Sequence, residues 1–561
     1  MQNVVQEVKG KIMAAITASA EKSKSAGQIS FDQLPSFVLE TPKEKAHGDF
    51  AANLAMLLTK QAKQPPRQLA QILVDNLDLD GTWVSKVEIA GPGFINFHLD
   101  QAWVYQVLPV ALNLDNRYGH SGAGQGKKVQ VEFVSANPTG LLHMGNARGA
   151  ALGDTLANLL AASGHEVTRE FYINDSGNQI ENFGKSLEAR YLQLMGQDVP
   201  FPEEGYHGQD IVETTKNLID RDGDKYLSMD SARRREEFVQ YGLQEKLTAI
   251  REVLAKFGVE YDVWFSEKTL HDSGAVKAVL EDLKSKGYIY EQEGALWFKS
   301  STFGDDKDEV VVRGNGTPTY FAADIAYHKN KFDRGFSRVI DIWGADHHGH
   351  VARMKGAVKA VGYDPDSLDV ILMQLVRLFK GGEIVRMSKR SGEFVTLDEL
   401  IDEVGKDAAR YFFVMRSADS HLDFDLDLAK SQSADNPVYY VQYAHARICS
   451  ILRQAKETGL EFPAPEGVDY SVLGKEEELE LIRKIADLPS EIAQAAVNME
   501  PHRVARYAHE LAGYFHSFYN ACRVMVEDEK LRAARLVLVD ASRITLRNTL
   551  HLLGLTAPER M

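Results

Sequence analysis

The chain has 561 residues, of which 44% are hydrophobic and 26% are charged, which is typical of a soluble globular protein and excludes a fibrous or mostly disordered one. At about 150 residues per domain, the length predicts three to four domains. A formal net charge of -16 argues against indiscriminate binding of nucleic acid through bulk charge.

Cysteine usage and hydropathy indicate the compartment. Two cysteines, Cys449 and Cys522, are too few for a disulfide framework or a thiolate zinc site, and they fit a reducing environment. No apolar run is long enough to span a bilayer, and the first residues lack the apolar stretch of a signal peptide. We therefore expect a cytoplasmic protein that is not embedded in a membrane.

The first 113 residues are predicted to form a small α+β domain. It begins with an amphipathic helix over about 4–23, continues through two helices separated by prolines at 65 and 66, and ends in a hairpin turned at Gly91-Pro92-Gly93. Turn residues and β-rich flanks agree on the hairpin. Residues 114–127 are rich in glycine, serine and asparagine, with few residues able to enter a core, and are predicted to be a linker.

From residue 128 the pattern changes to strand, glycine-bearing turn, long helix and strand, which is typical of a βαβ unit with a parallel sheet. We predict a Rossmann-like, doubly wound catalytic domain over 128–406. A charged, irregular insertion is expected at about 190–300, and the sheet is expected to resume at 339–343 and 370–379.

The last third of the chain, 407–561, is predicted to be an all-α bundle because almost everything in it has helical periodicity. Its prolines are expected where helices start or stop. They are Pro437, Pro463, Pro465, Pro489 and Pro501.

A polar segment from Ser135 to Asn146 joins the first strand of the predicted sheet to its helix. It therefore lies at the carboxyl edge of the sheet, where open α/β folds bind ligands. His143 and Asn146 are three positions apart and share one helical face, and Gly145 lets a ligand approach the backbone. Free amides and the positive dipole end favour an anion there. The segment predicts a phosphate-handling site, and the alternative is that His143 merely caps the helix.

A basic loop from Ile384 to Gly392 follows a glycine-turned hairpin and precedes a helix with a capping box at 396–399. Its cations Lys389 and Arg390 could neutralise charge on a transferring phosphate chain. The alternative is an ordinary solvated loop. Because it shares a predicted sheet domain with the His143 segment, we interpret the two as parts of one nucleotide site.

Together, the two segments resemble the HIGH-type and KMSKS-type signatures of class I aminoacyl-tRNA synthetases. Gly344-Ala-Asp346 resembles a third element of that class, in which the acidic residue holds the nucleotide ribose. Two departures stand out: Asn146 replaces the usual final histidine, and Arg386 and Arg390 replace the first lysine and the closing serine. Over essentially the whole chain the sequence resembles bacterial-type arginyl-tRNA synthetases. The stretches that carry this resemblance are His47–Phe50, Gly91–Asn96, Val131–Thr139, Tyr172–Asp175 and Asn436–Arg447.

The resemblance implies a two-step arginine–tRNA ligase, which forms arginyl-adenylate from L-arginine and ATP and then transfers arginine to the 3′-terminal adenosine of tRNA(Arg). Mg²⁺ is expected to arrive with the ATP, and no protein-bound zinc is expected. The first domain is expected to bind the tRNA elbow and the bundle the anticodon arm. We expect a monomer with neither DNA nor membrane as a partner.

The resemblance also assigns residues to the reaction. The expected catalytic residues are His143, Asn146 and Lys389. The expected ATP contacts are His143, Gly145, Asn146, Gly344, Asp346, His347, Met387, Ser388 and Lys389.

The expected arginine pocket also has a physical rationale. A guanidinium presents a planar fork of five donors, so a selective site needs carboxylates held in fixed geometry. Glu132 lies near the end of the first sheet strand, and Tyr320 and Asp324 share one helical face. The alternative is that both carboxylates are ordinary surface acids. By resemblance, these three residues contact the arginine side chain and Asn137 contacts its backbone end.

The cluster from Asp346 to His350 also permits a metal site, since it holds three histidines in four positions. The resemblance instead implies that Asp346 and His347 lie beside ATP and that His350 has only a packing role.

In the bundle, a polar stripe of three histidines and Arg506 is either a phosphate-tracking face or a solvated one. Its members are His502, Arg506, His509 and His516. The expected tRNA contacts there are Tyr439, Tyr443, Arg447 and Arg506, and Tyr439, Tyr440 and Tyr443 are expected to stack on bases or to enter the core.

Two rival functions stay open at this point. One is a class I synthetase for another amino acid, and the other is a tRNA-binding protein that has lost catalysis. The presence of His143, Gly145 and Lys389 argues against the second.

Overall fold

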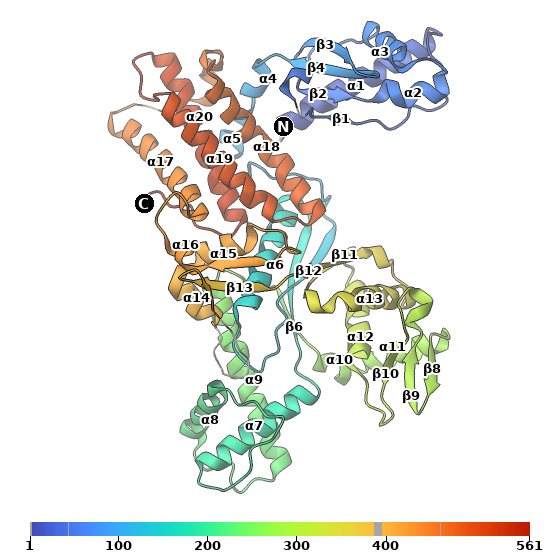
Figure 1. Ribbon diagram of the computed structural model, residues 1–561, viewed down its shortest axis with the longest axis vertical. Coiled ribbons are helices and arrows are strands. Elements are labelled where there is room, and N and C mark those ends of the chain that lie inside the picture. Colours follow the sequence, from blue (N-terminus) through green and yellow to red (C-terminus); the bar gives the residue numbers. More distant parts are fainter. Residues whose placement is uncertain (1–2, 43, 386–394, 461) are drawn as a thin grey trace.

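The computed structural model describes residues 3–42, 44–385, 395–460 and 462–561. The molecule is elongated, with the N-terminal domain and the helical bundle towards one end and the sheet domain in the middle (Figure 1). The helices α7 (Asn178–Leu194), α8 (Gln209–Asp222) and α9 (Ser231–Lys256) extend towards the opposite end.

The N-terminal domain packs three helices on a four-stranded antiparallel sheet. Helix α1 begins at the N-cap Asn3, whose side chain accepts a hydrogen bond from the amide of Gln6, and it buries a stripe from Val4 to Ala20. The predicted first helix and the predicted hairpin are confirmed. The elements are α1 (Val4–Ser25), β1 (Leu39–Glu40), β2 (Phe50–Ala52), α2 (Leu54–Ala62), α3 (Pro66–Asp75), β3 (Val84–Ala90) and β4 (Phe94–Leu99), with strand order β1-β2-β4-β3.

The segment after this domain packs against the C-terminal bundle. Tyr105 in α4 (Ala102–Tyr105) donates through its hydroxyl to the carbonyl of Leu473, and α5 (Val107–Leu114) follows. Within the expected linker, Tyr118 is only 2% exposed. The linker prediction rested on the many small and polar residues of this segment, and it missed that Tyr118 is buried in the core.

Pro489 corrects one expectation, because it lies inside α18 (Glu476–Asn498) and not at a helix end. Proline has no amide hydrogen, so the carbonyl four residues earlier loses its helical donor. That carbonyl belongs to Ile485, and the Tyr118 hydroxyl donates to it at 2.7 Å. The buried tyrosine thus satisfies the acceptor that the proline leaves behind.

A double-mutant cycle tests this pairing. Tyr118→Phe is expected to destabilise the protein by about 1–3 kcal/mol, because a buried carbonyl loses its donor. In a Pro489→Ala background an amide hydrogen returns to the helix, so the same change should cost less. Thermal unfolding of the four variants measures the coupling, and equal costs in both backgrounds would contradict the pairing.

The sheet domain is built on five parallel strands in the order β12-β11-β5-β6-β7, which confirms the predicted Rossmann-like sheet. From β5 the chain first adds β6 and β7 on one side and later adds β11 and β12 on the other, so the order of strands reverses between β5 and β11. Ligands bind at the carboxyl edge of a parallel sheet at such a switch point. The strands are β5 (Lys128–Glu132), β6 (Glu166–Ile173), β7 (Val263–Ser266), β11 (Arg338–Gly344) and β12 (Leu368–Met373). Helix α6 (Met144–Ala162) connects β5 to β6.

Strand β7 corrects the predicted insertion, since it lies within 190–300 and pairs with β6 in the main sheet. It has four half-buried residues at the sheet edge. It was not recognised in the sequence because the residues around it are charged and helix-forming. Helices α7 to α9 precede it. After it come α10 (Lys268–Asp272), α11 (Ala275–Ser285), a small antiparallel sheet of β8 (Ile289–Gln292), β9 (Ala295–Phe298) and β10 (Glu309–Val312), and α12 (Tyr320–Asp333).

A second small sheet corrects two further boundaries. The predicted strand at 370–379 is two strands, of which β13 (Val376–Lys380) leaves the main sheet and pairs with β14 (Glu383–Ile384) and β15 (Leu422–Asp425). Strand β15 falls inside the stretch expected to be all helical. Because it pairs in parallel with a strand far earlier in the chain, local periodicity gave no sign of it.

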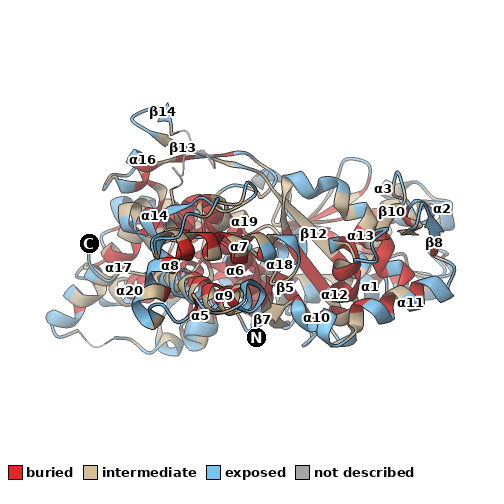
Figure 2. Cartoon of the chain, turned by 90° about the horizontal axis from the view of Figure 1, so that it is seen from below, coloured by how far each residue is buried: buried red, intermediate tan, exposed pale blue. Residues whose placement is uncertain are grey.

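The expected helical bundle is confirmed and consists of α17 (Pro437–Glu457), α18, α19 (His502–Ala521) and α20 (Glu529–Leu552). Helix α13 (His348–Ala360) connects β11 to β12 within the sheet domain, whereas α14 (Leu397–Val404), α15 (Lys406–Val414) and α16 (Leu426–Lys430) lie between that domain and the bundle. Buried residues gather at the centre around α6 and α19, whereas β14 stands away from the body (Figure 2).

Candidate active site

The amino end of α6 carries the first predicted motif. His143 is the N-cap, and its Nδ1 accepts a hydrogen bond from the amide of Gly145 at 3.1 Å. The Asn146 side chain accepts from the amide of His143 at 3.1 Å, which completes a capping box. Because Nδ1 accepts, the neutral imidazole carries its proton on Nε2 and can donate there. Capping and anion binding are therefore compatible roles.

The helix that follows the basic loop lies directly against this motif. Thr396 forms an antiparallel bridge with His143, and the amide of Leu397 donates to the carbonyl of Leu142 at 2.9 Å. The predicted capping box of α14 is confirmed, with Glu399 and Thr396 bonded reciprocally. The expected ATP contacts Met387, Ser388 and Lys389 lie outside the described residues.

The third predicted motif lies at the end of β11, beside β5. Gly344 ends the strand, and the side chains of Asp346 and His347 are 84% and 58% exposed. A β-carbon at position 344 would lie 2.5 Å from Asp346 Oδ1, so a larger residue there would displace this exposed carboxylate. The acidic side chain lies at the carboxyl edge of the sheet, near the switch point.

His350 does not join its neighbouring histidines in a cluster. Its Nε2 lies 3.4 Å from Asp324 Oδ2, and its ring packs on those of Trp343 and Phe321 at centroid distances of 5.5 and 5.6 Å. In the described part of the chain, no group of three or more histidine, cysteine or acidic residues is placed to hold a metal ion.

Glu132 is buried at the end of β5 and already has protein donors. Its Oε2 accepts from Lys331 Nζ at 2.5 Å and its Oε1 from Ser135 Oγ at 2.8 Å. Burial raises the pKa of Glu132 and outweighs the opposing effect of Lys331. The idea of an ordinary surface acid is wrong for this residue, because its carboxylate is buried and held by Lys331 and Ser135.

Lys331 joins Glu132 to a second buried acid. It is fully buried on α12 and also donates to Asp341 at 2.8 Å, and the other oxygen of Asp341 lies 2.8 Å from His328 Nε2. Burial alone would raise the pKa of Asp341, but Lys331 and His328 hold it at about 2. Sequence reasoning missed this network because its members lie on two strands and a helix far apart in the chain.

Tyr172 at the end of β6 contacts one carboxylate and is influenced by the charges of two others. Its hydroxyl donates to Glu267 at 2.8 Å, and its pKa is raised by burial and by the charges of Glu267, Asp324 and Glu132. Burial raises the pKa of the Tyr320 phenol, and the charge of Glu267 raises it further. Tyr172 is thus linked electrostatically to the predicted Glu132 and Asp324, and Glu267 is linked in the same way to the predicted Tyr320.

Two residues of this group were not predicted as site residues. Tyr172 lies in one of the stretches that carry the family resemblance, which was an available signal. Glu267, only 4% exposed, stands in a charged stretch just after the unrecognised β7. Burial raises its pKa as well, as is common where acids are gathered for a function.

The turn that leaves β5 is strained. Val134 and Ser135 adopt left-handed backbone conformations with φ of 69° and 41°, which a β-branched residue rarely takes. The turn brings Ser135 Oγ onto Glu132 and lets it accept from the amide of Tyr172 at 3.1 Å. Asn137 follows on the exposed side of the turn.

The expected tRNA contacts on the bundle fall into two groups. Tyr439 and Tyr443 lie stacked on α17 with centroids 6.0 Å apart, and Arg447 donates to the Tyr443 hydroxyl at 2.6 Å. Arg506 on α19 is 58% exposed and lies 3.7 Å from Glu510. The first group forms an aromatic row with a cation at its end.

The histidine stripe of α19 faces α17 in part. The ring of Tyr440 lies between those of His509 and His516, each with its centroid 4.9 Å away. Burial, and then the charge of Arg447, lower the pKa of His516 to about 4. The stripe is therefore not simply a solvated face.

This shift predicts an acid-sensitive bundle. Because the pKa of His516 is about 4 in the folded protein and near 6.5 in the unfolded chain, the unfolded chain binds more protons between these values. Stability should therefore fall as pH drops from about 6.5 to 4, by at most about 1.4 kcal/mol per pH unit from this group. His516→Gln should flatten the pH dependence of the unfolding temperature, and an unchanged profile would contradict the assignment.

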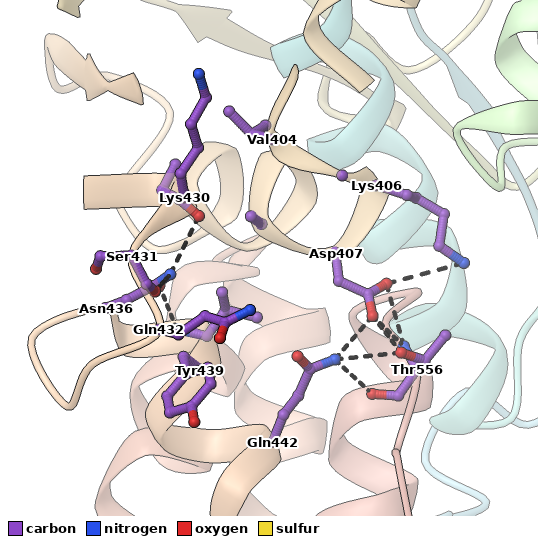
Figure 3. Close-up of a pocket in the computed structure, with 14 residues that line it drawn as sticks. Val404, Lys406, Asp407, Lys430, Ser431, Gln432, Asn436, Tyr439, Gln442 and Thr556 are labelled. Atoms are coloured by element: carbon purple, nitrogen blue, oxygen red, sulfur yellow. Dashed lines mark hydrogen bonds and ion pairs between the residues drawn. The ribbon is translucent and has the colours of Figure 1, made fainter. Parts of the chain in front are cut away.

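A cavity of about 400 Å³ lies elsewhere, between α15, α16 and α17 (Figure 3). Asp407 accepts there from Gln442 at 2.7 Å and from Thr556 near the chain end. Of the predicted site residues its lining includes Tyr439. It marks the junction of the sheet domain with the bundle.

Comparison with known proteins agrees with this architecture. The family "Arginyl tRNA synthetase N terminal domain" matches residues 6–99, "tRNA synthetases class I (R), catalytic domain" matches 107–419, and "DALR anticodon binding domain" matches 441–561. The fold and the ordered motifs at its carboxyl edge thus define a class I aminoacyl-tRNA synthetase.

Individual relatives narrow this class. Proteins named arginine–tRNA ligase from Heliobacterium modesticaldum and Moorella thermoacetica are each 66% identical, over 100% of both chains. The structure of Thermus thermophilus arginyl-tRNA synthetase has a TM-score of 0.76 at 23% identity and covers 98% of this chain and 100% of that one. The chain belongs to the arginyl-tRNA synthetase family. In the described residues no helix is long and apolar enough to cross a membrane.

Proposed function

We propose that the protein is an arginine–tRNA ligase whose arginine pocket is the group of carboxylates around Tyr172. The observation that carries the proposal is that Tyr172 donates to Glu267 at 2.8 Å and is also influenced by the charges of Asp324 and Glu132, beside the end of β5 that leads to α6. A guanidinium is the amino-acid side chain best matched to several fixed carboxylates, because its planar fork bonds more than one acceptor.

Within the pocket, the acids have different parts. Asp324 is 35% exposed and its closest partner is His350 at 3.4 Å, so we assign it to direct contact with the guanidinium, together with Tyr320. Glu132 is bonded to Lys331 and Ser135, so it contributes charge from the pocket floor. Asn137, exposed after the strained turn, is assigned to the backbone end of the substrate.

The chemistry proposed for the first step is an in-line displacement. A carboxylate oxygen of arginine bonds to the α-phosphorus of ATP, the bond to the bridging oxygen breaks, and pyrophosphate leaves. His143, Gly145, Asn146 and the amino end of α6 bind phosphate oxygens. Asp346 and His347, with Gly344 at the turn, take the ribose side, and Mg²⁺ is proposed to enter as part of the nucleotide substrate.

Met387, Ser388 and Lys389 are proposed for the triphosphate on the family resemblance alone. In the second step, a hydroxyl of the terminal adenosine attacks the arginyl carbonyl and AMP leaves. No covalent intermediate on a side chain is required, because positioning and charge stabilisation account for most of the rate.

The proposal extends to partners and location. tRNA(Arg) is proposed to lie along the bundle, with bases near Tyr439, Tyr443 and Arg447 and a phosphate near Arg506. The domain at 1–113 is proposed for the tRNA elbow, 128–406 for catalysis and 407–561 for the anticodon arm. A cytoplasmic monomer that binds neither DNA nor membranes completes the proposal.

The test is exchange of labelled pyrophosphate into ATP with each of the standard amino acids, with and without tRNA(Arg). Exchange that depends on arginine alone among the amino acids is expected. Exchange with another amino acid would point to a different synthetase. Tight tRNA binding without any exchange would point to a binding protein that has lost catalysis.

A further inference from the structure

A fully buried arginine lies in the second turn of α6, close to the proposed phosphate site. Arg148 is 0% exposed and stands five positions after His143. Charged side chains are rarely buried completely unless they are paired. Here the contacts that hold the charge are backbone carbonyls, and burial lowers the pKa of Arg148 to about 10 despite the charge of Asp419.

The guanidinium bonds three carbonyls from two separate segments. Nη1 donates to Gln374 at 2.8 Å and to Ser420 at 3.0 Å, and Nη2 donates to Ser417 at 2.8 Å. Gln374 joins β12 to β13, and Ser417 and Ser420 lie between α15 and β15. The three acceptors belong to loops and not to a helix or strand.

These loops meet at the root of the second small sheet. The amide of Gln374 donates to the carbonyl of Ala418 at 2.9 Å, and β13 and β15 begin their pairing at Val376 and Leu422. Next to Arg148, a β-carbon at Gly149 would lie 3.7 Å from the end of the Met373 side chain at the close of β12. One guanidinium therefore joins the start of α6 to the carboxyl edge of the sheet.

We propose that Arg148 is a positioning residue for the activation step, whose guanidinium holds the first turns of α6 against the segments that leave β12 and enter β15. The position of α6 along its own axis sets where His143 and Asn146 present their donors. A misplacement of about 1 Å in a site of this kind costs about a hundredfold in rate. The inference rests on the proposed function, in which the start of α6 binds the phosphates.

The chain offers a matched control in Arg410 on α15, which is also 0% exposed. It donates to the carbonyls of Leu553, Phe257 and Gly258 and to the carboxylate of Asp154, farther along α6. Its carbonyl acceptors lie at the ends of α20 and α9, its carboxylate acceptor lies in the middle of α6, and none lies at the carboxyl edge of the sheet. It is therefore at least as deeply built into the fold, but it does not hold the start of α6.

The experiment measures tRNA-dependent ATP–pyrophosphate exchange at a temperature below the unfolding transition of each variant. Arg148→Met is expected to lower kcat about a hundredfold while KM for arginine stays within about twofold. Arg148→Lys keeps the charge but lacks the fork that spans two loops, so its kcat should also fall, by about tenfold. Arg410→Met should lower the unfolding temperature at least as much and leave kcat within about threefold.

Each outcome decides the matter. A folded Arg148→Met variant with the wild-type kcat would overturn the inference, as would an equal loss of kcat in Arg410→Met. If Arg148→Met does not fold, the lysine variant carries the test, and wild-type kcat in that variant would overturn it. Failure of the proposed function looks different, because the unaltered protein would then show no arginine-dependent exchange.

Discussion

Asp324→Asn is expected to lower kcat/KM for arginine by about a hundredfold to a thousandfold in the pyrophosphate exchange reaction. Asparagine keeps the shape of the side chain but removes the negative charge of Asp324, which we propose to pair with the guanidinium of arginine. Loss of one partner in a close charge pair costs about 2–5 kcal/mol, and each 1.4 kcal/mol is a factor of ten. The effect should appear mainly in KM, because the contact exists before and during the reaction.

Asp333 provides the control for this change. It stands on the same helix, α12, and bonds Lys329 at 2.7 Å on the surface. Asp333→Asn should leave kcat/KM for arginine within about twofold. Full arginine activation by Asp324→Asn would reject its role in the pocket and would favour a synthetase for another amino acid.

Lys331→Met is expected to destabilise the protein by about 3–5 kcal/mol, the cost of leaving buried charge without its partner. Two carboxylates, Glu132 and Asp341, depend on this one ammonium group. Thermal unfolding of the variant measures the loss. Lys329→Met is the control, because Lys329 pairs with Asp333 on the surface of the same helix and exposed pairs contribute only about 0–1 kcal/mol.

The loss in Lys331→Met should depend on pH in a defined direction. The pKa of Glu132 is raised in the folded protein by burial, so above the ordinary value for glutamate the folded state binds more protons than the unfolded chain. Stability then falls as pH rises, and removal of Lys331 strengthens this trend. The deficit should therefore be smaller at pH 5 than at pH 7, and a deficit that grows on acidification would contradict the explanation.

Local patterns predicted the parts of the fold in which neighbouring residues decide the structure. The hairpin around Gly91 to Gly93 and the capping box at Thr396 are confirmed because each depends on a few consecutive residues. The alternation of strand, turn and helix from residue 128 likewise predicted the parallel sheet, since βαβ units impose that order.

The errors concern contacts between distant segments. Strands β7 and β15 have four residues each, and what defines them is pairing with β6 and β13, which no local period reports. Pro489 was wrongly expected at a helix end. The helix tolerates it because the carbonyl of Ile485, which the proline leaves without a donor, accepts a hydrogen bond from Tyr118, 367 positions earlier in the chain. Short elements and long-range partners thus account for the corrections.

The candidate site divides in the same way. On its nucleotide side, each segment is a run of neighbouring residues, and the one around His143 was predicted as a motif. Its arginine side is proposed to be assembled from β5, β6, α12 and the residue after β7, and the family resemblance indicated Glu132, Tyr320 and Asp324 but not Glu267. The inner partner Lys331 was missed, because a lysine on a helix is usually a surface residue.

The bond between Glu132 and Lys331 has a consequence for biosynthesis. The two residues are 199 positions apart, and ribosomes add about 5–20 residues per second. Synthesis of Lys331 therefore follows that of Glu132 by on the order of ten to forty seconds. If the core packed around β5 before then, the Glu132 carboxylate would be buried without its counter-charge. A nascent chain arrested before Lys331 should stay sensitive to proteases, and completion of the domain should follow release of α12 from the exit tunnel.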